Sequence, residues 1–172
     1  ILFALVISGC SSTKRFSSDS NLDANSSILV RVLLDNNSSE LTISVTDDIV
    51  ISDDKKSLAK VAFGNKLKFN NYAGKLKLTI ADKEFLSDTF SLTSDNETDL
   101  VKIDQKKYRG KIKVFIKDSD IKIVNQLGLE DYVKGVMAKE MPIGKGKENY
   151  DALKSFSICV RTYAFNKINE QK

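Results

Sequence analysis

The chain contains no histidine and no tryptophan, and it has one proline and two cysteines. The absence of histidine excludes Ser-His-Asp and Cys-His catalysis, HExxH proteases and histidine-ligated metal sites. The sequence also lacks the G-x-x-x-x-G-K-[ST] phosphate loop of nucleotide-binding proteins. With 41% hydrophobic residues and so little proline, the chain can still build a substantial core.

The first cysteine follows the apolar run ILFALVISG, which is typical of a secretion signal. Its last residues, Ile7-Ser8-Gly9-Cys10, resemble a bacterial lipobox, in which the cysteine is lipidated after cleavage. The run is too short to span a bilayer, which takes about 20 helical residues. We therefore expect an exported lipoprotein, anchored to the membrane through Cys10 and facing the periplasm or cell wall. The alternative is a buried strand or short hydrophobic helix that happens to end in a cysteine.

The second cysteine, Cys159, lies between Ile158 and Val160 in a segment with helical periodicity. It is left without a disulfide partner once Cys10 is lipidated. A nucleophilic role would want a basic partner such as histidine, which the chain lacks. We expect Cys159 to be a small, buried hydrophobic side chain.

The net charge of +4 comes from lysines that alternate with apolar residues, as in KIK, KLKL and KLKF. This alternation is typical of a sheet with one solvated face. Some attraction to anionic wall polymers is compatible with it. Nucleic acid is not expected as a partner, because no aromatic residues interleave with the lysines and the signal exports the chain.

Between Ile28 and Ile123 the hydrophobic period is mostly two, and Asn and Asp residues mark the turns. Predicted strands are Ile28–Leu34, Leu41–Val45, Ile49–Ser52, Lys66–Phe69, Lys75–Ile80, Phe85–Leu92, Leu100–Ile103, Lys111–Ile116 and Ile121–Asn125. Two helical segments follow. The expected fold class is α+β: a β-rich N-terminal region of short, mostly antiparallel strands followed by two packed helices.

The first helix is predicted from about Gly128, with Glu130 four residues before Lys134, and Pro142 stops it. Leu129, Val133, Val136 and Glu140 share one face at helical spacing. A carboxyl on such a face is expected to be partly shielded from water, which favours its protonated form and suits a general acid. The alternative is a glutamate that bends into solvent.

The second helix is predicted from about Glu148 to beyond Phe165. Its broad apolar face comprises Ala152, Leu153, Phe156, Cys159, Val160 and Tyr163. Lys154 and Arg161 lie seven residues apart and so share another face. Packed against the first helix, this helix is expected to direct Arg161 or Tyr163 toward Glu140, with salt bridging and core packing as alternatives.

The segment from Tyr108 to Phe165 resembles the SpoIID/LytB family of bacterial cell-wall proteins. The matching residues are Tyr108, Gly110, Asn125, Leu129, Glu130, Tyr132, Gly135, Val136, Glu140, Met141, Pro142, Ala152, Leu153, Lys154, Arg161, Thr162, Tyr163 and Ala164. The resemblance implies a lytic transglycosylase that cleaves peptidoglycan glycan strands, with Glu140 as catalytic acid/base. It favours a structural or substrate-binding role for Lys154, Arg161 and Tyr163. LytB-like members instead imply a non-catalytic modulator of an N-acetylmuramoyl-L-alanine amidase.

The chain departs from the family at residues 155–160, SFSICV, where members usually have smaller residues. The family domain normally continues past its R-T-Y element, and some members bind zinc with residues of that later part. We therefore expect no metal and no cofactor in this chain. The expected organisation is a signal and lipobox (1–10), a flexible tether (11–26), a β-rich region (27–105) and a SpoIID/LytB-like region (106–172).

Overall fold

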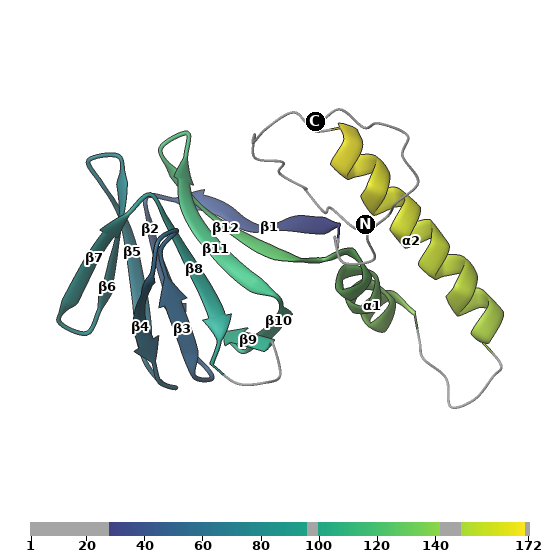
Figure 1. Ribbon diagram of the computed structural model, residues 1–172, viewed down its shortest axis with the longest axis horizontal. Helices are drawn as coiled ribbons and strands as arrows, with labels where there is room; N and C mark the ends of the chain where they lie inside the picture. The colour runs from purple at the N-terminus through teal and green to yellow at the C-terminus, as the bar shows by residue number, and fades with distance from the viewer. Residues whose placement is uncertain (1–27, 96–99, 142–148, 171–172) are drawn as a thin grey trace. The chain divides into compact units, whose positions relative to one another are not determined.

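The computed structural model describes residues 28–95, 100–141 and 149–170 (Figure 1). The predicted lipidation site Cys10 and the predicted tether lie outside these residues. The described elements are β1 (Leu29–Ser38), β2 (Glu40–Ser44), β3 (Ile49–Ser52), β4 (Ser57–Val61), β5 (Lys66–Tyr72), β6 (Lys75–Ile80), β7 (Lys83–Ser87), β8 (Thr89–Ser94), β9 (Leu100–Ile103), β10 (Lys106–Arg109), β11 (Lys111–Lys117), β12 (Asp120–Gly128), α1 (Leu129–Glu140) and α2 (Tyr150–Glu170). Strands followed by two helices confirm the predicted α+β class.

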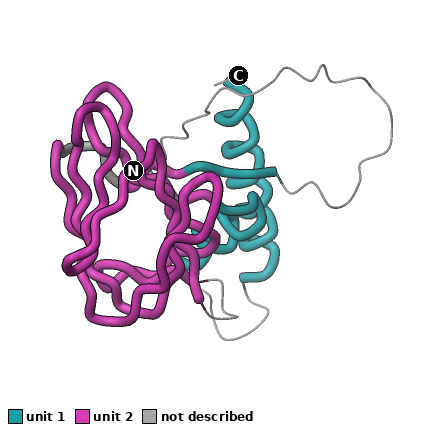
Figure 2. Tube along the Cα trace, turned by 60° about the vertical axis from the view of Figure 1, so that its left-hand side comes forward, with its two compact units in different colours: residues 1–31, 127–172 teal, residues 32–126 magenta. Residues whose placement is uncertain are grey.

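The chain divides into two compact units, which Figure 2 distinguishes by colour. Unit 2 comprises residues 32–126 and holds the strands except the start of β1 and the end of β12, while unit 1 comprises residues 1–31 and 127–172 and holds both helices. The sequence predicted a division between the β-rich region (27–105) and the SpoIID/LytB-like region (106–172), near the point where the family resemblance begins. The compact units change later, at residues 126 and 127, because β11 and β12 are paired over seven residues within one sheet.

Three sheets account for the strands: a six-stranded sheet in the order β1-β12-β11-β8-β3-β4, a four-stranded sheet in the order β2-β5-β6-β7, and the hairpin β10-β9. Within unit 2 the two larger sheets share one core. Phe69 of β5 and Phe90 of β8 are fully buried, and their ring centroids lie 6.0 Å apart. Alternating apolar residues of both sheets complete this core, as expected from strands that each bury one face.

Two-residue loops close several hairpins of unit 2. Ala73 and Gly74 join β5 to β6, and Asp118 and Ser119 join β11 to β12; all four residues have positive φ. Positive φ at both loop positions matches the right-handed twist of antiparallel strands. Asp118 fits the expectation that Asn and Asp residues mark the turns, whereas the loop between β5 and β6 falls on Ala73 and Gly74, three residues after Asn70 and Asn71.

Sequence periodicity identified most strands and missed two. The bounds of β3, β6 and β9 agree with the predictions, but β4 and β10 were not predicted. The predicted strand Phe85–Leu92 is two strands, because the chain leaves the four-stranded sheet at exposed Asp88 and enters the six-stranded sheet. At this break the Ser87 hydroxyl donates to the Thr89 carbonyl over 3.0 Å.

Candidate functional site

Helix α1 begins and ends where local backbone chemistry requires. Gly128 is extended (φ −68°, ψ 150°), and the acidic residues Glu130 and Asp131 occupy the first turn, where the helix dipole stabilises negative charge. At the other end Met141 is extended (φ −117°, ψ 128°), as a residue before proline prefers. Its N–H donates to the Met137 carbonyl over 3.1 Å. Glu140 is therefore the last helical residue.

Helix α2 packs against α1 within unit 1 and buries little of its own surface. Val160 and Ala164 are its buried residues, while Ile158 is 61% exposed and Phe165 is 46% exposed. At its start the Leu153 N–H donates to the Asn149 carbonyl over 2.8 Å. One side of α2 therefore meets α1, and apolar side chains remain exposed elsewhere along it.

A groove of about 370 Å³ lies between the two helices. Its lining residues are Tyr132, Val136 and Glu140 of α1 and Phe156, Cys159, Val160 and Tyr163 of α2. Glu140 is the only carboxylate among the described residues of this lining. The groove thus combines one acidic group with aromatic and apolar walls.

Glu140 is exposed, so the expected partial shielding of this side chain is wrong for the described residues. Its position on the final turn explains the difference, because no further turn of α1 follows to cover the carboxylate. The side chain nevertheless lines the groove to which both helices contribute.

Tyr132 is the buried polar side chain of the groove, with 7% of its surface exposed. Burial raises the pKa of its phenol, and the nearby Tyr163 raises the pKa further. The Tyr132 hydroxyl therefore keeps its proton at neutral pH and can donate a hydrogen bond into the groove. Tyr132 lies four residues before Val136 and eight before Glu140, so helical spacing places it on the same side of α1. This spacing is the sequence signal that could have identified Tyr132.

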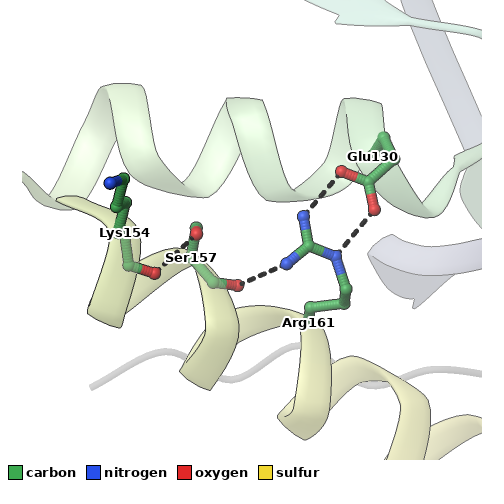
Figure 3. Close-up of polar contacts among 4 residues, drawn as sticks. All are labelled: Glu130, Lys154, Ser157 and Arg161. Atoms are coloured by element: carbon green, nitrogen blue, oxygen red, sulfur yellow. Dashed lines mark hydrogen bonds and ion pairs between the residues drawn. The ribbon is translucent and has the colours of Figure 1, made fainter.

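Arg161 of α2 reaches Glu130 of α1 rather than Glu140 (Figure 3). Its Nε and Nη2 donate to the two Glu130 carboxylate oxygens over 2.7 and 2.8 Å. Hydrogen bonding from Arg161 lowers the pKa of Glu130. Of the two side chains expected to approach Glu140, Tyr163 lines its groove and Arg161 instead joins the helices. Lys134, which was expected to support Glu130, pairs with Asp131 at 3.3 Å.

Lys154 does not line the groove. Its ammonium lies 4.2 Å from the centroid of the Tyr150 ring, a cation–π contact at the start of α2. Its carbonyl accepts a hydrogen bond from the Ser157 hydroxyl over 2.7 Å, as Figure 3 shows. Among the predicted substrate-binding residues, the structure brings Tyr163 alone to the groove lining with Glu140.

Cys159 is exposed, so the predicted buried thiol is wrong. Among the described elements α2 packs against α1 along one side, and Cys159 lies at the open groove. Periodicity indicates which residues share a face and does not indicate how much of that face a neighbour covers.

A scan of protein families matches residues 117–172 to SpoIID, stage II sporulation protein. This match confirms the resemblance to the SpoIID family in the C-terminal part of the chain. The match covers β12, α1 and α2, and therefore the whole groove. It indicates a cell-wall-related function. No curated protein and no solved structure matched the chain.

Within the part of the chain that the structure describes, no three or more cysteine, aspartate or glutamate side chains gather in a group that could hold a metal ion. Among the helices that the structure describes, none has the length and hydropathy needed to cross a membrane.

Proposed function

We propose that this protein modifies peptidoglycan as a lytic transglycosylase, with Glu140 as the single acid/base. The observation that carries the proposal is the groove between α1 and α2, where one carboxylate faces aromatic side chains. The SpoIID match over the same residues supports it. Aromatic rings such as Tyr163 and Phe156 offer apolar faces against which sugar rings can pack.

One carboxylate is enough for this reaction class. Hydrolytic glycosidases use two carboxyl groups, one as acid and one as base or nucleophile. In a lytic transglycosylase the 6-hydroxyl of muramic acid is the nucleophile. Protonated Glu140 would donate its proton to the glycosidic oxygen as the C1–O bond breaks. The resulting Glu140 carboxylate would take the proton of the 6-hydroxyl as the 6-hydroxyl oxygen bonds to C1. This step closes the anhydro ring and restores the protonated carboxyl of Glu140.

The exposure of Glu140 bears on this mechanism. A general acid must carry its proton when it acts on the leaving oxygen. A glycan strand seated in the groove would displace water from the carboxylate and favour the protonated form. The proposal therefore places the activation of Glu140 in the substrate complex.

The variant Glu140→Gln tests the proposal, because glutamine keeps the shape and cannot supply the proton. Release of anhydromuramic products from purified glycan strands, followed by mass spectrometry, should fall by at least about a hundredfold. Glu170→Gln, at the end of α2 and outside the groove lining, is the matched control and should retain activity. Unchanged release by Glu140→Gln would remove Glu140 from the mechanism.

A second candidate function is the non-catalytic modulator of an N-acetylmuramoyl-L-alanine amidase. The exposed apolar side chains of α2, among them Ile158 and Phe165, favour a protein-docking role. Assays with and without an amidase separate the two functions. Anhydro products without the amidase support the enzyme, and products that form only by stimulated amidase activity support the modulator.

We further propose that the protein acts at the outer side of the membrane, tethered through lipid on Cys10. This rests on the apolar run and lipobox pattern of the sequence. Cys10→Ala should move the protein from the membrane fraction to the soluble exported fraction. A membrane fraction that is unchanged by this substitution would contradict the lipid anchor.

A further inference from the structure

The outward face of the four-stranded sheet in unit 2 carries a row of lysines. In β5, Leu67 and Phe69 are fully buried, so the alternating Lys66 and Lys68 face away from the core. In β6, Leu76 and Leu78 are fully buried, so Lys75 and Lys77 face the same way. We call Lys66, Lys68, Lys77 and Lys75 the lysine row.

The strand register places these four side chains in a line. Lys77 pairs with Asn70, and Lys68 pairs with Thr79, so Lys68 and Lys77 are diagonal neighbours on one face. Lys66 continues the line along β5, and Lys75 continues it along β6 in the opposite chain direction. Residues two apart in a strand are separated by about 7 Å. The row is therefore a narrow stripe of positive charge with a regular spacing.

Most of this charge is not neutralised by the described side chains. Lys77 pairs with Glu84 at 3.0 Å and lies 5.5 Å from the centroid of the Tyr72 ring. Lys66, Lys68 and Lys75 are exposed, and no ion pair joins them to another side chain in the described ranges. Other lysines of unit 2 are paired, such as Lys60 with Asp95 at 2.9 Å and Lys102 with Asp47 at 2.6 Å.

Small polar side chains flank the lysine row. Thr42 and Ser44 of β2 lie opposite Lys68 and Lys66, and Thr79 of β6 lies opposite Lys68 on its other side. Hydroxyl groups donate hydrogen bonds to anionic oxygens without adding charge. The carboxylates Glu40 and Glu84 lie on the same face, and Glu84 is already paired with Lys77.

We propose that the lysine row binds a linear anionic polymer with one phosphodiester per repeat. A glycerol phosphate repeat contains six chain bonds, as two residues of a strand do, so both repeat at about 7 Å when extended. Successive phosphates can therefore meet successive ammonium groups in one register. A membrane surface fits less well, because binding in the plane of a bilayer needs apolar side chains that insert together. The exposed Tyr72 and Leu86 lie on β5 and β7, with β6 between them, and the Lys77 ammonium lies over the Tyr72 ring.

The test compares two triple variants of the full chain that lose the same charge. Lys66→Gln, Lys68→Gln and Lys75→Gln together remove the unpaired part of the row. Lys55→Gln, Lys106→Gln and Lys117→Gln together remove three exposed lysines from other strands and turns. The probes are fluorescent poly(glycerol phosphate), polyglycerol without phosphate, and vesicles of phosphatidylglycerol. Circular dichroism checks that both variants keep their fold.

The unaltered chain should bind poly(glycerol phosphate) and not polyglycerol. The row variant should bind about tenfold more weakly at low salt, and the slope of log K against log salt should flatten by about two, because three phosphate contacts are lost. The control variant should bind within about threefold of the unaltered chain, since its lysines contribute only through net charge. Equal weakening in both variants, absence of polymer binding, or binding to the vesicles alone would each overturn the proposal.

Discussion

Unit 2 and the helical part of unit 1 bury their apolar residues to very different extents. In unit 2, large side chains such as Phe69, Phe90 and Leu78 are fully buried between two sheets. In unit 1, α2 has two buried residues, and the aromatic residues Tyr150, Tyr163 and Phe165 are each more than 40% exposed. The two sheets bury the apolar residues of their strands against each other, whereas many apolar residues of the helix pair remain exposed.

The difference suggests that unit 2 contributes most of the stability of the fold, whereas unit 1 carries the candidate functional site. In a closed core, removal of even one methylene group lowers the free energy of unfolding, because the packed side chains cannot fill the cavity that is left. The groove of unit 1 requires the opposite, since a ligand can enter only where side chains are left uncovered. The family match lies over the groove, while the core that should dominate the free energy of unfolding lies mainly in unit 2.

The largest expected effect is on the core of unit 2. Phe90→Ala removes a fully buried ring that contacts Phe69, and should lower the free energy of unfolding by about 3–5 kcal/mol. The matched change in unit 1, Phe165→Ala, removes a ring that is 46% exposed and should cost less than about 1.5 kcal/mol. Urea denaturation of both variants measures the difference. Equal losses would mean that the two units do not differ as described.

A smaller effect is expected from the ion pair between the helices. Glu130→Gln should lower the free energy of unfolding at pH 7 by less than about 1 kcal/mol, because the pair is largely exposed. Arg161 lowers the pKa of Glu130 below its ordinary 4.5, so the stabilisation is present above pH 4.5 and is lost as pH falls through the lowered value. The difference between the two proteins should therefore shrink in acid. The variant Glu40→Gln, which removes an exposed carboxylate of β2, is the control for the loss of one negative charge.

The smallest effect on stability is expected at Cys159. Since the thiol is exposed, Cys159→Ser should change the free energy of unfolding by less than about 0.5 kcal/mol. In a Cys10→Ser chain, Cys159 should react with a maleimide without denaturant. If Cys159 reacts only after the chain is unfolded, the thiol is buried, as the sequence predicted.

Much of the fold was predictable because strand and helix patterns are local. The alternation in Lys75–Ile80 sets both the bounds of β6 and the face that it buries. The missed strand β10 has the sequence KKYR, which has no apolar alternation, and it forms because it pairs with β9 through a hairpin. Such a strand is defined by its partner, and its own residues carry too little signal.

The site was predictable in part for the same reason. The position of Glu140 on the last turn of a helix follows from the extended residue before Pro142 and from helical spacing. The partner of Arg161 does not follow from spacing, because Glu130 lies 31 residues away on another helix. Helix packing selects that pair, and several other carboxylates were available by sequence alone.

The sequence by itself determined the α+β class, most of the strands, both helices and the place of Glu140 at a helix end, because these depend on local periodicity and backbone chemistry. Only the tertiary structure decided that Arg161 joins the helices, that Cys159 is exposed, that Tyr132 and Tyr163 line one groove with Glu140, and that four lysines of two strands form a row. Those arrangements depend on the register of paired strands and on how far one helix covers another, and neither quantity is encoded in any single element.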